Sequence, residues 1–301
     1  MKETRLDKYE LEKFLPKFFS DNKVQASFFS SFYPLHTFLN YGSNQLKSLN
    51  FNGKEYLLLH KLEKKEYRFL FVNPEKGLFE EFEKEFFPRY VGLNLLQTES
   101  DLEVKSNTDE IVIDISKIVS LKDKKIKHDY NLAKKHNPDL LVESYIYDKH
   151  IGKILEFLEN WRYTRTDKQN SYARVENDLQ FFTSFGREEK TKGIVILDKE
   201  KIIGYSIFTS HDLEKSSCIS LFSKVLRGYK YLGMFLAVEK AREMEKEGYD
   251  MAYLGSVNND FKKHFMSLGE KITLHSAELY RFEKMILVRL SPEEYSNVIL
   301  G

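Results

Sequence analysis

The order of secondary structure from Gly193 onward constrains the fold of this chain most strongly. Three strand-like segments are followed by a turn that contains glycine, a long amphipathic helix and a further strand. We expect the strands at Gly193–Leu197, Ile202–Thr209, Cys218–Ser223 and Met251–Leu254, and the helix at Met234–Glu247. Apolar residues of this helix recur at i, i+3, i+4, i+7 and i+10 from Met234, which predicts one face packed on a core. A helix at Asp260–Ser267 and strands at Ile272–Arg281 and Lys284–Leu290 complete the predicted series.

The preceding part of the chain also alternates between predicted helices and strands. Aromatic residues at helical spacing occupy the first forty residues, and we expect Pro16 and the cluster Ser20–Asn22 to break this helical run in two. Strands are expected at Glu55–His60, Tyr67–Val72, Ile111–Ile115 and Leu141–Tyr147, and helices at Glu75–Phe87, Leu121–His136, Ile151–Tyr163 and Asp178–Phe185. The chain is therefore expected to mix both kinds of element throughout.

Composition excludes several classes of protein. Hydrophobic residues make up 42% of the 301 residues and charged residues 31%, which excludes a disordered chain and a coiled-coil rod. The 47 basic and 46 acidic residues leave a net charge of +1, so a nucleic acid or an anionic membrane would have to bind a local patch. The single Cys218 excludes a disulfide framework and a cysteine zinc cluster.

The same counts indicate a compartment. One cysteine suits a reducing environment. No apolar stretch approaches the ~20 residues that a membrane-spanning helix needs. Charged residues occupy the N-terminal segment 1–14, where a signal peptide would be apolar. We therefore expect a soluble, cytoplasmic protein with no transmembrane segment and no bound metal.

The most basic stretch is Leu121–His136, which holds six lysines and two aspartates. It is either a solvated helix face or a contact for phosphate or nucleic acid, and in the second case Lys124, Lys125 and Lys127 are the candidate contacts. Arg162 and Arg165 lie three residues apart on one predicted helix face and are candidates for the same role. The alternative for these arginines is a salt bridge to nearby acids such as Glu159.

The glycine-bearing turn before the long helix carries a resemblance. The series of elements resembles the GNAT acyltransferase fold, in which a turn of the form Arg/Gln-x-x-Gly-x-Gly/Ala binds the pyrophosphate of an acyl-CoA through backbone N–H groups. Unpaired amides and the dipole of a helix N-terminus favour such an anion. The best match here is Lys230-x-x-Gly233-x-Phe235, with lysine in the basic position and a bulky residue in the last one. The resemblance implies donor contacts at Lys230, Leu232, Gly233 and Met234; the alternative is a helix cap beside a surface lysine.

A second segment, Asn258–Gly269, is similar to the GNAT segment in which asparagine precedes a short helix that ends in Tyr-x-x-Leu-Gly-Phe. Asn258 would cap this helix and complete the donor site. The family tyrosine, often the general acid, falls on Phe265, which cannot donate a proton. Tyr280 and His264 are then the candidates for acid or base catalysis. Packing for Tyr280 and an exposed helix position for His264 are the alternatives.

A narrower resemblance covers Asp109–Tyr163 and Gly193–Arg281. These segments resemble the C-terminal family of phosphatidylglycerol lysyltransferases, through Leu121–Lys125, Tyr130-Asn131 and the tryptophan helix Phe157–Trp161. Asp123 and Tyr130 stand where that family has glycine and arginine.

The narrower resemblance implies an α/β (α+β) fold of two tandem GNAT-like units, each a mixed, mostly antiparallel sheet flanked by helices. The expected division is residues 1–120, a basic connecting helix at 121–138, and residues 139–301.

The resemblance implies an acyltransferase that moves an acyl or aminoacyl group from acyl-CoA or aminoacyl-tRNA to an amine or hydroxyl. The acceptor would be a small molecule, a peptide or a lipid head group. A non-catalytic binding module on a degenerate GNAT scaffold is the first alternative, because Asp123, Tyr130, Phe235 and Phe265 each depart from a family position. A nucleic-acid binder that uses only the basic helix is the second, and the near-zero net charge argues against it.

Overall fold

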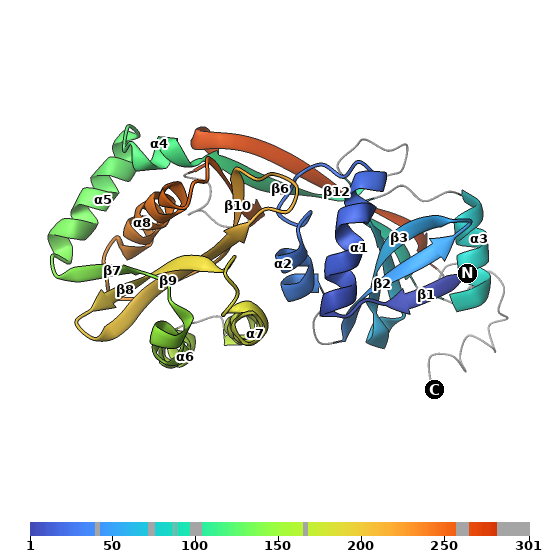
Figure 1. Cartoon of the computed structure of the whole chain (residues 1–301), viewed down its shortest axis with the longest axis horizontal. Coiled ribbons are helices and arrows are strands. Elements are labelled where there is room, and N and C mark those ends of the chain that lie inside the picture. Colours follow the sequence, from blue (N-terminus) through green and yellow to red (C-terminus); the bar gives the residue numbers. More distant parts are fainter. Residues whose placement is uncertain are drawn as a thin grey trace, which may run out of the picture. The chain divides into compact units, whose positions relative to one another are not determined.

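The computed structural model describes residues 1–39, 43–71, 76–86, 88, 90–96, 104–164, 168–256 and 265–281 (Figure 1). It divides into two compact units. Unit 1 takes its described residues from 1–25, 38–108 and 273–281, and unit 2 from 26–37 and 109–272. The mixed α/β fold class expected from the sequence is confirmed, with mostly antiparallel strands and helices in both units.

Unit 1 is built on a sheet whose neighbouring strands are β1 (Lys2–Arg5), β2 (Asn44–Phe51), β3 (Lys54–Lys61), β4 (Glu66–Leu70) and β5 (Tyr90–Leu96). All neighbours are antiparallel except β4 and β5, which are parallel. Helix α3 (Lys76–Phe86) connects these two parallel strands, as a parallel pair requires. The second half of β12 (Gly269–Arg281) pairs antiparallel with β5.

Unit 2 has the same plan. Its neighbouring strands are β7 (Leu140–Ser144), β8 (Lys192–Asp198), β9 (Lys201–Ser210), β10 (Ser217–Val225) and β11 (Met251–Ser256). Only β10 and β11 are parallel, and helix α8 (Leu232–Lys246) connects them. Strand β6 (Val104–Asp114) pairs antiparallel with β11. Helices α6 (Tyr147–Tyr163) and α7 (Lys168–Phe185) cover one face of this sheet, and α5 (Lys124–His136) and α8 cover the other (Figure 1).

The two units therefore repeat one topology, four antiparallel strands followed by a helix and a parallel strand. Each sheet is completed by a strand that follows the other repeat in the chain, because β6 comes after β5 but pairs with β11, and β12 comes after β11 but pairs with β5. The two units thus repeat one topology, and each also receives its last strand from the segment that follows the other unit's repeat.

Helix α1 (Lys8–Asp21) contradicts the expected break at Pro16. The helix begins at a capping box of Asp7 and Glu10 and continues through Pro16. Four apolar residues on one face are buried, namely Leu11, Leu15, Phe18 and Phe19. Burial of this face offsets the hydrogen bond that proline cannot donate, so packing overrides the local preference.

Residues 26–37 cross to unit 2, which explains why its limits differ from the division expected from the sequence. Ser31 donates its hydroxyl hydrogen to Asp212 over 2.7 Å, and Tyr33 donates to Glu188 over 2.7 Å. The ring Nε2–H of buried His211 donates to the carbonyl of Ser27. The basic helix α5 also differs from the expectation of a connector, because it packs within unit 2 against α8.

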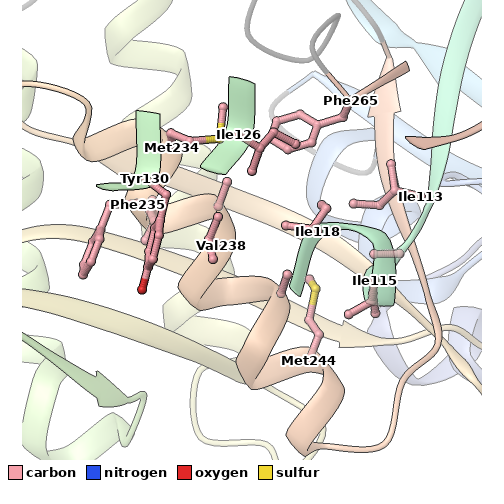
Figure 2. Packing of buried hydrophobic residues seen from close by; sticks show 14 of the residues in the cluster. Ile113, Ile115, Ile118, Ile126, Tyr130, Met234, Phe235, Val238, Met244 and Phe265 are labelled. Carbon is pink, nitrogen blue, oxygen red and sulfur yellow. The ribbon is translucent and has the colours of Figure 1, made fainter. Parts of the chain in front are cut away.

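The core of unit 2 accounts for three residues that depart from the family patterns. Tyr130 of α5 and Phe235 of α8 stack with ring centroids 5.5 Å apart and planes inclined by 9° (Figure 2). The Tyr130 hydroxyl donates to Glu239 and accepts from Arg242 over 2.7 Å. Phe265 is 2% exposed and belongs to the same core cluster. All three positions are therefore occupied by packing residues, and two of them pack on each other.

We predict that unit 1 loses stability as the pH falls from 6.5 towards 4. His60 stacks on Tyr67 with ring centroids 3.9 Å apart, and burial, then the charge of Lys47, lowers its pKa to about 4. An unfolded histidine has a pKa near 6.5, so the unfolded chain binds more protons in this window and stability is complete only above it. Urea unfolding at a series of pH values should show a shallower decline for His60→Gln. His128→Gln, at an exposed position, should retain the wild-type slope.

Candidate donor site

The sheet of unit 2 opens beside β10. Strand β10 pairs with β11 only over Ser217–Ile219, although it continues along β9 as far as Val225. A bulge lies between Ser220 and Phe222, just after this pairing ends. Beyond the bulge, β10 has no second neighbouring strand among the described residues. Ser223 is exposed there, although its strand lies in the interior of the sheet order.

The loop from Leu226 to Tyr231 leads from this opened strand into α8. Gly228 has φ +103° and Tyr231, the residue before the helix, has φ +60°. A left-handed conformation is unfavourable for a bulky residue and costs about 1–3 kcal/mol, so surrounding contacts must hold Tyr231. The helix has no side-chain cap, and no described residue accepts the N–H of Gly233. That donor is free to bind an anion at the positive end of the helix dipole.

Three contacts hold the loop in place. Tyr229 donates its hydroxyl hydrogen to Asp198 over 2.7 Å, which also raises the pKa of the tyrosine. The amide of Asn137 donates to the carbonyl of Lys230 over 3.2 Å. The ring of Tyr231 stacks on His136, with centroids 5.9 Å apart. Two of these three anchors come from the C-terminal end of the basic helix α5.

Only the C-terminal end of the basic helix therefore contacts the loop from Leu226 to Tyr231. Its last turn contains Lys134, Lys135 and His136, all exposed, and the loop adds exposed Arg227 and Lys230. The predicted contacts Lys124, Lys125 and Lys127 are exposed at the opposite end of α5. A helix rises 1.5 Å per residue, so about 18 Å separates Lys124 from His136.

Structure comparisons place this geometry in a known fold. A conserved protein of unknown function from Bacteroides thetaiotaomicron superposes with a TM-score of 0.68 at 14% identity, over 92% of this chain and 99% of its own. The C-terminal domain of a candidate lysylphosphatidylglycerol synthetase from Agrobacterium fabrum has a TM-score of 0.58 at 10% identity, with coverages of 93% and 96%. A tandem GNAT protein from the clavulanic acid biosynthesis pathway has a TM-score of 0.53 at 11% identity, with coverages of 92% and 98%.

The chain has the tandem GNAT-like fold. No family model and no curated protein matches its sequence. In unit 2, the chain runs from β10 through the loop into α8. Gly233, the residue on which the resemblance to the GNAT turn rests, is the second residue of α8. Leu232 and Met234 are buried at the start of α8, so their side chains are core residues and only their backbone can face a ligand.

Of the remaining predicted site residues, the structure describes Tyr280 on β12 and Arg162 on α6. Tyr280 lies on β12 opposite Val91, in the part of that strand that belongs to unit 1. His264, Asn258 and Arg165 lie outside the described residues, so their roles stay predictions. Arg162 is at the C-terminal end of α6, where its guanidinium is 4.9 Å from the ring of Tyr163 and 4.6 Å from that of Tyr172. Both rings belong to exposed tyrosines.

Two kinds of feature are absent from the residues that the structure describes. None of their helices combines the length and the apolar character required to cross a bilayer. Nor do three or more of their His, Cys, Asp or Glu side chains come together in a way that could hold a metal ion.

A buried ionic network on the other face of the sheet had no signal in the sequence. The ammonium of Lys224 on β10 donates to both carboxylate oxygens of Asp178 on α7, over 2.6 and 2.5 Å, and the hydroxyl of Tyr205 donates to the same carboxylate. The ring of Trp161 lies 5.2 Å from the ammonium. Burial raises the pKa of Asp178 and lowers that of Lys224, while each attracts the opposite charge of the other. The network joins α6, α7, β9 and β10.

We predict that removing one partner of this network destabilises unit 2 strongly. Lys224→Met leaves a buried carboxylate without its cation, and such a loss costs about 3–5 kcal/mol. The double variant Lys224→Met with Asp178→Leu removes both charges and should recover much of the loss. Chemical unfolding of the wild type, both single variants and the double variant gives the coupling energy. A double variant as unstable as the sum of the singles would contradict the expectation.

Proposed function

We propose that this protein is an acyltransferase of the GNAT type. It would move an acyl or aminoacyl group from acyl-CoA or aminoacyl-tRNA to an amine or hydroxyl of a small molecule, a peptide or a lipid head group. The observation that carries the proposal is the start of α8, where a strained loop, an uncapped helix N-terminus and a cluster of basic side chains meet beside the opened edge of β10.

This arrangement suits a donor with an anionic and a reactive end. The N–H of Gly233 and the cations Lys230, Arg227, Lys134 and Lys135 would bind the phosphates. Beyond Ile219, β10 has no second neighbouring strand among the described residues, so its backbone groups could bind the arm of the donor as an added strand would. A thioester or an aminoacyl ester is already activated, so positioning and stabilisation of the oxyanion supply the catalysis without a nucleophile from the protein.

A non-catalytic binding module is the second candidate function. The burial of Phe265 favours it, because the position of the family acid is closed to substrate and occupied by a group that cannot donate a proton. Both candidates bind the same donor class. Incubation of the protein with a radiolabelled donor and a panel of amine acceptors separates them, since only the enzyme yields a transferred label.

We expect Gly233→Asp to weaken donor binding by at least tenfold, which corresponds to about 1.4 kcal/mol. The new carboxylate would face the donor phosphates at the position of the free N–H. Titration of acetyl-CoA and of charged tRNA by calorimetry measures the loss. Gly77→Asp, at the second position of helix α3 in unit 1, is the matched control and should bind as the wild type does. If the Gly233 variant bound every donor with the affinity of the wild type, the proposed site would be contradicted.

Charge reversal at the two ends of α5 distinguishes the donors. Lys134→Glu with Lys135→Glu should reduce affinity for either donor, because this end adjoins the loop. Lys124→Glu with Lys125→Glu should matter only for tRNA, whose backbone can extend along the helix. For tRNA, each lost phosphate contact should lower the slope of log affinity against log salt by about 0.7–0.9. Equal binding by both double variants and the wild type would remove α5 from the site.

A further inference from the structure

One charged side chain lies inside the helical layer beside the opened strand. Lys240 of α8 is buried, and its ammonium donates to the hydroxyl of Ser220 over 2.9 Å and to that of Ser223 over 3.4 Å. Both serines belong to β10. The neighbouring residues on the buried side of α8 are apolar, among them Leu236, Ala237, Ala241 and Met244. A cation in such a layer is costly, so its presence requires a reason beyond packing.

The position of Lys240 relates it to the donor site. Gly233 and Lys240 are seven residues apart, so they lie on the same face of α8, about 10.5 Å apart along the helix axis. The first marks the anionic end of the proposed site. The second reaches Ser220, which lies at the bulge just after β10 and β11 stop pairing. One face of α8 thus carries Gly233 at the proposed phosphate-binding end and Lys240 near Ser220, where β10 and β11 stop pairing.

One of the two serines that hold the buried ammonium is exposed. Ser206 of β9 donates to the carbonyl of Phe222 over 2.8 Å and shares a 2.7 Å hydrogen bond with the hydroxyl of Ser223. These contacts fix the Ser223 hydroxyl. Ser223 itself is exposed, so the group that holds the buried cation faces the opening. Lys240 is therefore orientated by the sheet and lies within hydrogen-bond distance of exposed Ser223.

This location matches a chemical requirement that Phe265 leaves unmet. Departure of a thiolate or an alkoxide needs a proton, and the oxygen of the tetrahedral intermediate needs a hydrogen-bond donor. Phe265 supplies neither and is buried in the core. An ammonium supplies both from one group.

We propose that Lys240, held by Ser220 and Ser223, is the catalytic proton donor of the transfer reaction; this assignment rests on the proposed function. The acceptor nitrogen or oxygen bonds to the acyl carbon, and the bond from that carbon to the leaving sulfur or oxygen breaks. The leaving atom takes a proton from the ammonium of Lys240. The proton lost by the acceptor passes to water, and water returns a proton to Lys240.

The test uses donors that differ only in the leaving group. The wild type, Lys240→Met and Ser220→Ala are assayed with an alkyl thioester or ester of one acyl group and with its p-nitrophenyl counterpart, whose leaving group departs without a proton. Lys240→Met should lower kcat/KM about 10²–10³-fold with the alkyl donor and less than threefold with the activated donor. Ser220→Ala should show the same selectivity with about a tenfold loss. Because it keeps the cation and removes only a hydroxyl, it tests the assignment even where Lys240→Met fails to fold.

Lys246→Met is the matched control, since Lys246 is exposed on the same helix and pairs with Glu243. It should match the wild type with both donors. Equal losses with both leaving groups in the Lys240 and Ser220 variants, or no loss, would overturn the assignment while the proposed function stands. Absence of transfer by the wild type with every donor would overturn the proposed function and this assignment together. Retention of donor affinity by Lys240→Met, measured by calorimetry, separates its role from that of Gly233.

Discussion

The short parallel pairing of β10 with β11 is the constraint on which the site depends. Parallel neighbours need a crossover, and α8 supplies it, so its N-terminus lies where β10 ends. Pairing over only three residues then leaves the rest of β10 with one strand neighbour among the described residues. The N-terminus of α8, exposed Ser223 and buried Lys240 all lie beside this part of β10. A longer parallel pairing would close it.

The packing of α5 on α8 is the second condition. Tyr130 and Phe235 fill the contact between the two helices, and the hydroxyl of Tyr130 joins Glu239 and Arg242 at its edge. With this contact in place, the last turn of α5 lies against the loop from Leu226 to Tyr231, which Asn137 and His136 contact. Tyr130 and Phe235, which differ from the residues of the resembled families at these positions, thus pack on each other. The same packing brings Lys134 and Lys135 to the loop and leaves Lys124 at the far end.

Much of the fold followed from local patterns. The helical period of α8, the three strands before it and the basic helix were all predicted near their observed limits, because each buries one face whose spacing is visible in the residues. Strand β2 was missed, since Asn44–Phe51 alternates weakly and contains no strong strand signal. The break at Pro16 was wrong because a buried aromatic face outweighs one lost hydrogen bond. The transfer of residues 26–37 to unit 2 rests on contacts such as Ser31 with Asp212, far apart in the chain.

The residues alone determined the class of the fold, the place of the glycine turn and the reason to doubt a tyrosine acid, since these depend on neighbours in the chain. Tertiary structure decided which cations meet the turn, what replaced the family residues and where buried charges lie. The buried ammonium of Lys224 is paired with Asp178, and that of Lys240 is hydrogen-bonded to Ser220; each contact joins a helix to the sheet. A burial cost and its compensation arise only when distant segments pack together, so no local pattern could have revealed either lysine.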